Sequence, residues 1–197
     1  MARVRPAVII ETGTYRGGLA YFFATLFEFL GLSRSMVITM DAFSLHDNFN
    51  NLDNNRICPV CAECVRAYET PAWKRHVVFF EGNSWKLASR VQKAMHEAAE
   101  GPVLLSLDSQ HSYENVLAEL HQYAPLVTSG SYIIVQDSKI DLLYGRIGPA
   151  TAADHMLRKN PGMWKLDFGA ARHHGYSQHL WLRKVGHGQA EVLLSFD

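Results

Sequence analysis

The sequence lacks an excess of charge of either sign, and it also lacks long apolar runs. It has 19 Lys and Arg residues against 19 Asp and Glu residues, so no summed field would steer nucleic acid or an anionic membrane surface toward it. No apolar stretch approaches the roughly 20 residues that a membrane-spanning helix needs. The N-terminus shows no cleavage site of a signal peptide. We therefore expect a cytoplasmic protein whose partners are neither nucleic acid nor membrane.

Cysteine is also scarce, and all three cysteines, Cys58, Cys61 and Cys64, lie close together in one segment. An odd, clustered set suits neither a disulfide framework nor a secreted fold. The spacing suits one structural zinc ion if His46, His76 or a partner chain supplies the fourth ligand. An iron–sulfur cluster would need a fourth cysteine. Zinc binding and free thiols in a loop both remain open as interpretations.

Strand-like apolar runs alternate with helical ones along the chain, which is typical of an α/β fold. Continuous apolar runs bounded by turn residues predict buried parallel strands at residues 7–11, 36–41, 76–83, 102–108 and 131–137. The segments between these runs carry apolar residues at helical spacing, and residues 151–159 predict one more helix. Residues 163–169 and 177–185 predict an antiparallel hairpin at the C-terminal end of a mostly parallel sheet.

The length of 197 residues suits one domain, so we expect a single domain over residues 1–197. Residues 42–70 are rich in Asn, carry the cysteines and have no period, which predicts an insertion. In the first helix, Tyr21 and Phe27 would lie outside the core and could contact a second copy of the chain. The face of that helix that we expect to enter the core consists of Leu19, Phe22, Phe23, Leu26, Phe29 and Leu30.

Polar side chains end or follow the predicted strands, and in an open parallel sheet the carboxyl ends of strands form the ligand-binding edge. The glycine turn at residues 11–18, ETGTYRGG, lacks the G-x-G-x-x-G pattern that places a pyrophosphate on a helix N-terminus. Glu11 would repel a phosphate but suits a ligand that carries an amino group and a sulfonium, and Asp41 could bind ribose hydroxyls. S-adenosylmethionine fits that description. The alternative is that Gly13, Gly17 and Gly18 serve only tight packing.

Two segments, IIETGTYRGGLAYFFATL and LSLDSQHSYENVLAELHQYAPLVTSGSYIIVQD, resemble the cephalosporin hydroxylase and rhamnosyl O-methyltransferase family, a branch of the class I S-adenosylmethionine-dependent methyltransferases. The resemblance covers about residues 7–137. It implies a Rossmann-like fold with helices on both faces of the sheet, and O-methylation of a hydroxylated small molecule such as a sugar or glycosylated metabolite. The cofactor-binding residues that we expect are Glu11, Gly13, Tyr15, Gly17, Asp41, Asn83, Ser84 and Asp108.

The same resemblance implies that Asp108 and an acidic pair at the end of the next strand bind a divalent metal, usually magnesium, and that His111 is the general base. The pair here is Gln136 and Asp137, whereas the family commonly has Glu at the first position. Magnesium prefers oxygen ligands and would stabilise the alkoxide of the acceptor. Gln136 offers an oxygen but no charge, so we expect weaker metal binding. The alternative is that Asp108 and Ser109 merely cap a helix.

Two other function classes remain as alternatives. The first is a non-catalytic relative that binds S-adenosylmethionine or zinc as an assembly module, and the second is a nicotinamide-dependent oxidoreductase. A serine hydrolase is not indicated, because no G-x-S-x-G elbow precedes a helix. The first predicted strand starts within ten residues of Met1. Methyltransferases of this class usually carry helices before the first strand, and these helices cover the cofactor. We therefore expect either that the chain is trimmed or that the cover comes from elsewhere.

Overall fold

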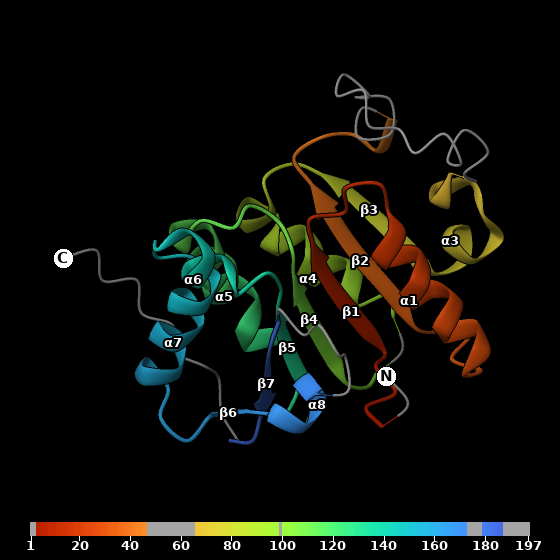
Figure 1. The fold of residues 1–197 in the computed structure, drawn as a ribbon. Helices are drawn as coiled ribbons and strands as arrows, with labels where there is room; N and C mark the ends of the chain where they lie inside the picture. The colour runs from red at the N-terminus through yellow and green to blue at the C-terminus, as the bar shows by residue number, and fades with distance from the viewer. Residues whose placement is uncertain (1–2, 47–65, 99, 173–178, 187–197) are drawn as a thin grey trace.

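A computed structural model describes residues 3–46, 66–98, 100–172 and 179–186. Its centre is a seven-stranded sheet of order β3-β2-β1-β4-β5-β7-β6 (Figure 1). Strands β1 to β5 run parallel, while β7 is antiparallel to both β5 and β6. The strands are β1 Val8–Thr12, β2 Met36–Asp41, β3 Val77–Glu81, β4 Val103–Leu107, β5 Tyr132–Val135, β6 Trp164–Leu166 and β7 Leu180–Lys184. The predicted parallel sheet and C-terminal hairpin are confirmed.

Helices cover both faces of this sheet. They are α1 Gly18–Phe29, α3 Pro71–His76, α4 Ala88–Met95, α5 Tyr113–Tyr123, α6 Ile140–Tyr144, α7 Pro149–Lys159 and α8 Phe168–Arg172, with short 3₁₀ helices η2 Ala67–Glu69, η3 Ser84–Lys86 and η4 Ala124–Leu126. None of the helices in the described ranges is long and apolar enough to cross a bilayer. After β3 the chain forms the 3₁₀ helix η3, and α4 begins two residues after its end.

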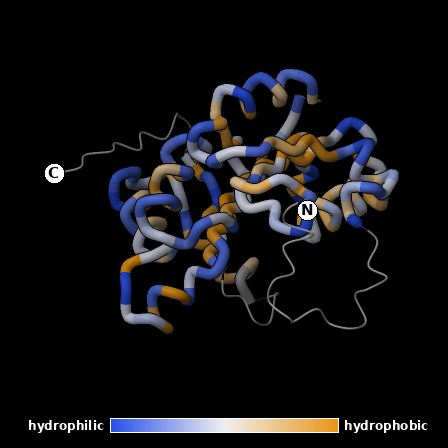
Figure 2. The backbone as a smooth tube through the Cα atoms, turned by 90° about the horizontal axis from the view of Figure 1, so that it is seen from above, coloured by the Kyte–Doolittle hydropathy of each residue, from blue (hydrophilic) through white to orange (hydrophobic). Residues whose placement is uncertain are grey.

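Two apolar clusters fill the layers between sheet and helices. Alternate residues of a strand point to opposite faces, so Val8 and Ile10 enter the cluster that includes residues of α4, α5 and α7. Ile9 enters the second cluster, with residues of α1 and α3. Figure 2 shows many of the hydrophobic segments along the centre of the molecule and hydrophilic ones toward its periphery. Burial of both sheet faces explains why the central strands are continuously apolar.

The buried face of α1 differs from the prediction. Phe22 and Phe29 are 54% and 84% exposed, whereas Phe27 is fully buried and lies 5.6 Å, between ring centroids, from the ring of His76. The helix buries Ala20, Phe23, Ala24 and Phe27, a stripe at helical spacing whose two alanines permit close packing. The prediction that Phe27 is available for a contact between subunits is therefore wrong.

The predicted insertion is described only at its two ends. Residues 42–46 and 66–70 are described, the latter carrying η2. Thr70 caps α3 by accepting a hydrogen bond from the Trp73 backbone N–H at 3.3 Å. Cys58, Cys61 and Cys64 lie outside the described residues, so zinc binding stays a prediction. His76, one candidate for the fourth ligand, is 2% exposed, and its Nδ1 lies 2.8 Å from the Ser35 carbonyl oxygen. This geometry makes His76 a core histidine.

Candidate functional site

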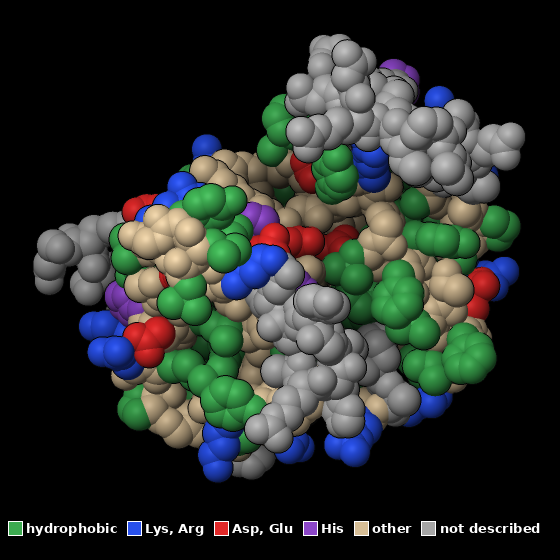
Figure 3. Space-filling view, in the orientation of Figure 1, with side chains coloured by type: hydrophobic (Ala, Val, Ile, Leu, Met, Phe, Trp, Pro, Cys, Tyr) green, Lys and Arg blue, Asp and Glu red, His purple; other side chains and the backbone are tan. Residues whose placement is uncertain are grey.

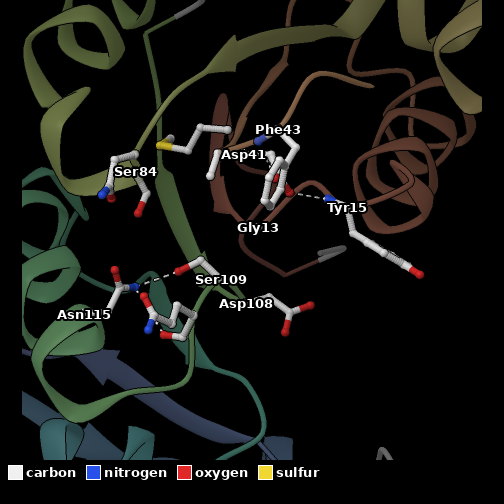
Figure 4. Close-up of a pocket in the computed structure, with 12 residues that line it drawn as sticks. Gly13, Tyr15, Asp41, Phe43, Ser84, Asp108, Ser109 and Asn115 are labelled. Atoms are coloured by element: carbon white, nitrogen blue, oxygen red, sulfur yellow. Dashed lines mark hydrogen bonds between the residues drawn. The ribbon is translucent and has the colours of Figure 1, made fainter. Parts of the chain in front are cut away.

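A cavity of about 650 Å³ opens at the carboxyl ends of the central parallel strands (Figure 4). Its size lies within the range of about 300–1,000 Å³ that is usual for small-molecule sites, and its position matches the ligand-binding edge of an open α/β sheet. The residues that line it are Gly13, Tyr15, Met40, Asp41, Ala42, Phe43, Asn83, Ser84, Asp108, Ser109, Gln110 and Asn115. Six of the eight residues predicted to bind the cofactor are among them, and Glu11 and Gly17 are not.

The turn between β1 and α1 depends on two glycines in different ways. Gly13 has φ +85°, and a Cβ atom there would lie 2.0 Å from the Asp108 backbone oxygen, so only glycine lets the turn approach the end of β4 this closely. Gly17 has φ +78°, and a Cβ atom there would lie 2.7 Å from the Trp73 ring of α3. Gly17 therefore serves packing, while Gly13 serves both packing and the cavity.

Asp41, the last residue of β2, is fixed by backbone donors. Its carboxylate accepts a hydrogen bond from the Tyr15 N–H at 2.7 Å and one from the Phe43 N–H at 3.0 Å. Tyr15 adopts φ +47°, an uncommon value for a residue other than glycine, which aims its N–H at Asp41. A carboxylate has about four acceptor positions, so Asp41 keeps acceptor capacity for hydroxyl groups of a ligand.

Glu11 lies beneath the cavity, with only 1% of its surface exposed. Its carboxylate accepts a hydrogen bond from the Thr39 hydroxyl, which in turn bonds the Thr14 hydroxyl at 2.7 Å. Burial raises the pKa of Glu11 to about 8, the Thr39 hydrogen bond opposes that rise, and the negative charges of Asp108 and Asp41 add to it. The predicted negative group next to the turn is therefore present, but as a buried carboxyl group that holds its proton at neutral pH.

Asp108, His111 and Asp137 form a cluster at the ends of β4 and β5, and one candidate ligand atom from each lies within 4.8 Å of the others. The His111 Nε2 atom is 3.4 Å from an Asp108 oxygen and 3.7 Å from an Asp137 oxygen. Asp137 adopts φ +48°, and its N–H donates to His179 Nδ1 at 3.2 Å. A strained backbone of this kind persists where the surroundings hold it and is frequent at functional sites.

The electrostatics of His111 follow from its two acidic neighbours. The hydrogen bond to Asp108 and the charge of Asp137 raise the pKa of His111, whereas its partial burial opposes the rise. Two carboxylates with a half-buried imidazole beside them are a donor set that fits a hard divalent cation. The cluster can therefore hold a metal ion, with His111 either as a base beside it or as an additional ligand.

Gln136 occupies the position next to this cluster but is turned toward the sheet. Its Nε2 atom donates to the hydroxyl of Ser106, a fully buried residue of β4, at 3.0 Å. The formal negative charge of the cluster therefore comes from Asp108 and Asp137 alone.

The residue that caps the N-terminus of α5 lies in the loop before the helix. Ser112 is the N-cap and accepts a hydrogen bond from the Asn115 N–H at 3.3 Å. The alternative in which Asp108 and Ser109 cap the helix is therefore wrong, and the residues from Asp108 to His111 form a loop at the cavity.

Sequence reasoning missed Ser109, Asn115 and Glu119. Ser109 and Asn115 line the cavity, and Glu119 is fully buried behind them. One signal was present, since an acidic residue interrupts the apolar face of the predicted helix that carries Leu117 and Leu120, and a buried carboxylate needs partners.

Comparison with known proteins gives consistent matches. The family model described as Rhamnosyl O-methyltransferase/CmcI matches residues 1–183. A rhamnosyl O-methyltransferase of Mycobacterium tuberculosis is 31% identical over 143 residues, which cover 72% of this chain and 49% of that protein. One of Mycobacterium leprae is 27% identical over 184 residues, which cover 90% of this chain and 70% of that protein. The chain thus spans about half the length of the M. tuberculosis relative.

Solved structures agree on the fold. CalS11, a TDP-rhamnose 3'-O-methyltransferase in calicheamicin biosynthesis, has a TM-score of 0.59 and 21% identity, over 90% of this chain and 71% of its own. A CmcI structure with Mg and SAM has a TM-score of 0.57 and 18% identity, over 94% of this chain and 67% of its own. The Rossmann-like class I methyltransferase fold predicted from the sequence is confirmed.

Proposed function

This chain belongs to the rhamnosyl O-methyltransferase/CmcI family, and from that premise we propose that it is an S-adenosylmethionine-dependent, divalent-metal-assisted O-methyltransferase. The acceptor is a hydroxyl group of a sugar or glycosylated small molecule. The observation that carries the proposal is the convergence of Asp108, His111 and Asp137 beside the cavity that Gly13 and Asp41 line. In this arrangement, the residues proposed to bind the metal and to act as base lie beside a cavity large enough for the cofactor.

The cofactor occupies that cavity in the proposal. Asp41 binds the ribose hydroxyls, because its carboxylate is already oriented by two backbone N–H groups. Asn83 and Ser84 lie at the adenine, and Gly13 lets the chain approach the amino acid end closely. Glu11 would act on the cofactor without lining the cavity, because the cationic groups of the cofactor favour the ionised form of its buried carboxyl group.

The chemistry needs a deprotonated acceptor oxygen aimed at the methyl carbon. The acceptor oxygen would form the new bond to that carbon, the bond from carbon to sulfur would break, and the hydroxyl proton would go to the imidazole of His111. Asp108 and Asp137 would hold a divalent cation, which would supply charge stabilisation for the developing alkoxide. His111 suits the role of base because the carboxylates of Asp108 and Asp137 raise its pKa and would stabilise the imidazolium that forms when it takes a proton.

The acceptor lies in a second cavity of about 500 Å³ on the other side of His111. Its walls combine polar groups with apolar side chains, as a hydroxylated ring requires: Gln110, His111, Ser112, Tyr113, Glu114, Ile140, Arg146 and Ile147. Figure 3 shows histidine and acidic side chains beside a hydrophobic group of α6 at this face. Asp108 of the charged cluster thus lines the proposed cofactor site, and His111 lines the proposed acceptor site.

The first experiment is calorimetric titration with S-adenosylmethionine, with and without magnesium, of the protein and its Asp41→Ala variant. We expect binding to the protein and a loss of about 10- to 100-fold in the variant, because charged hydrogen bonds contribute roughly 1.5–3 kcal/mol each. Asp154→Ala is the matched control, since Asp154 pairs only with the exposed Arg158 at 2.8 Å. Absence of binding to the unmodified protein would refute the methyltransferase proposal.

A non-catalytic binding module is the second candidate, because the cluster has two formal negative charges and Gln136 turns away from it. That candidate predicts cofactor binding that magnesium does not alter, with no methyl transfer to any rhamnoside. Methyl transfer to TDP-rhamnose or a simple rhamnoside, abolished by a chelator, would exclude it.

Asp141→Asn should raise the KM for the acceptor about 10-fold and leave the Kd for the cofactor unchanged. The Asp141 carboxylate accepts hydrogen bonds from the Gly148, Ala150 and Thr151 N–H groups at 3.0, 3.1 and 2.9 Å, and one from the Thr151 hydroxyl at 2.6 Å. These bonds fix the loop that carries Arg146 and Ile147 into the acceptor cavity, and an amide can accept only part of them.

The measurement is steady-state kinetics with TDP-rhamnose as the probe, beside cofactor titration. Asp167→Asn is the control, because it loses bonds from the Tyr132 hydroxyl at 2.8 Å and the Ala170 N–H at 2.9 Å, away from both cavities. An equal rise in KM in both variants would show that Asp141 contributes only general stability.

A further inference from the structure

Glu119, in the middle of α5, is a buried acidic residue that the proposed chemistry does not use. It is 0% exposed. Its carboxylate accepts hydrogen bonds from three hydroxyl groups: that of Thr12 at 3.1 Å, that of Ser109 at 2.5 Å and that of Ser84. These three residues come from the ends of β1 and β4 and from the segment after β3. One carboxylate therefore joins three of the segments that surround the cofactor cavity.

The protons in this network can be counted. A hydroxyl group has one proton and two acceptor lone pairs, and Ser84 and Ser109 both direct their protons to Glu119, away from the cavity that they line. Ser109 also accepts a hydrogen bond from the Asn115 side-chain amide at 2.9 Å (Figure 4). Toward the cavity, both serine hydroxyls can therefore offer only lone pairs, and that of Ser84 has no hydrogen bond from the protein among those described.

The three hydroxyl groups and the Asn115 side-chain amide around Glu119 favour its ionised form. Three converging O–H groups need acceptors, and a protonated carboxyl group would direct its own proton at one of them. Burial raises the pKa of Glu119, and the hydrogen bonds from Ser109, Ser84 and Thr12 oppose that rise. The same three hydroxyl groups therefore limit how far burial raises the pKa of Glu119.

We propose that Glu119 determines cofactor specificity by making this end of the cavity a hydrogen-bond acceptor, which selects a ligand with an N–H donor such as the exocyclic amino group of adenine and disfavours a 6-oxo purine. This inference rests on the proposed function for the presence of an adenine at Ser84. A carbonyl oxygen there would face the lone pairs of the serine hydroxyls, and neither serine could turn its proton without leaving Glu119 short of a donor.

Glu119→Gln tests the inference. The amide keeps the shape but replaces one acceptor oxygen with an NH₂ donor. Ser84 and Ser109 both donate to Oε1 of Glu119, so an NH₂ group at that position makes both hydroxyls accept from it and lets them turn their protons toward the cavity. Thr12, which donates to Oε2, then keeps an acceptor in the amide oxygen. The measurement is the ratio of the Kd values for S-inosylhomocysteine and S-adenosylhomocysteine. We expect the unmodified protein to prefer the amino compound by about 10- to 100-fold, and the variant by less than about 3-fold.

Two further variants keep the test decisive. Ser84→Ala removes the acceptor itself and should lower the ratio in the same way, even if Glu119→Gln fails to fold. Asp167→Asn, which loses a hydrogen-bonded carboxylate away from both cavities, should keep the full ratio. An unchanged ratio in both Glu119→Gln and Ser84→Ala would overturn the inference while leaving the methyltransferase proposal intact. Failure of the unmodified protein to bind either compound would instead overturn the proposed function, and this inference with it.

Discussion

Asp108→Asn should lower kcat for methyl transfer by about 1,000-fold, the largest effect on turnover that we expect from a single substitution. The cluster has only the charges of Asp108 and Asp137 to hold a cation, and the substitution removes one of them. The lost stabilisation of a developing alkoxide corresponds to several kcal/mol in other metal-assisted sites. Asparagine keeps the shape of the side chain at the cavity, so the Kd for S-adenosylmethionine should change less than 10-fold.

The measurement is magnesium-dependent methyl transfer to TDP-rhamnose, with the magnesium concentration for half-maximal rate determined for each variant. Asp154→Asn is the control for a general effect of removing a carboxylate from the surface. Gln136→Glu should act in the opposite direction and lower the half-maximal magnesium concentration about 10-fold. It adds a third negative charge next to the cluster and removes the amide N–H that turns Gln136 toward Ser106. Unchanged turnover and magnesium dependence in Asp108→Asn would show that the cluster is not the metal site.

The sheet and its ligand-binding edge were predictable because each depends on a strong local pattern. Short continuous apolar runs bounded by turn residues, such as residues 77–80, are typical of buried strands, and parallel strands bring their carboxyl ends to one edge. Asp41 and Asp108 therefore had to lie near each other once the strand order was known. The fold places both of them around one cavity.

The orientation of α1 was not predictable by the same route. Aromatic residues occur on more than one side of that helix, so the sequence offers several apolar stripes, and hydrophobicity alone favoured one with Phe22 and Phe29. Packing selected the stripe with Ala20 and Ala24, because small residues let α1 approach the sheet closely. Side-chain volume decided which face of α1 is buried. Whether a side chain of a given volume fits depends on the surface that it packs against, which the sequence of one helix does not show.

The residues of the site were predictable from the sequence, but their hydrogen bonds and protonation states were not. The loop from Asp108 to His111 was identified, yet the burial of Glu11 and the network around Glu119 depend on contacts between segments up to 107 residues apart, such as Thr12 with Glu119. A carboxylate in a sequence does not reveal whether it faces solvent, a ligand or other side chains, and its pKa depends on that difference.

Glu11→Gln should stabilise the folded protein above neutral pH, and this is the largest effect on stability that we expect. The pKa of Glu11 is raised from 4.5 to about 8 in the fold, chiefly by burial. Below pH 4.5 the carboxyl group is protonated in both states. Between pH 4.5 and 8 the folded state retains a proton that the unfolded state loses, so the free energy of unfolding falls as the pH rises. The fall is on the order of 3–5 kcal/mol, at about 1.4 kcal/mol per pKa unit.

Glu11→Gln has no carboxyl group that titrates at this position, and its amide oxygen can still accept the hydrogen bond from the Thr39 hydroxyl. Its melting temperature should match that of the unmodified protein near pH 4.5 and exceed it by several degrees at pH 8 to 9. Glu81→Gln, at the exposed carboxyl end of β3, is the control for removing a carboxylate that is not buried. Parallel stability curves for Glu11→Gln and the unmodified protein between pH 4.5 and 9 would contradict the raised pKa.

A cationic ligand above Glu11 should reverse this balance. The sulfonium and amino groups of S-adenosylmethionine favour the ionised carboxylate, so binding at pH 7 should release a proton from Glu11. Calorimetric titrations in two buffers of different ionisation enthalpy measure that proton. We expect release by the unmodified protein, less release with S-adenosylhomocysteine, which lacks the sulfonium charge, and none in Glu11→Gln. Equal proton release in the protein and the variant would assign it to another group and leave Glu11 without a part in cofactor binding.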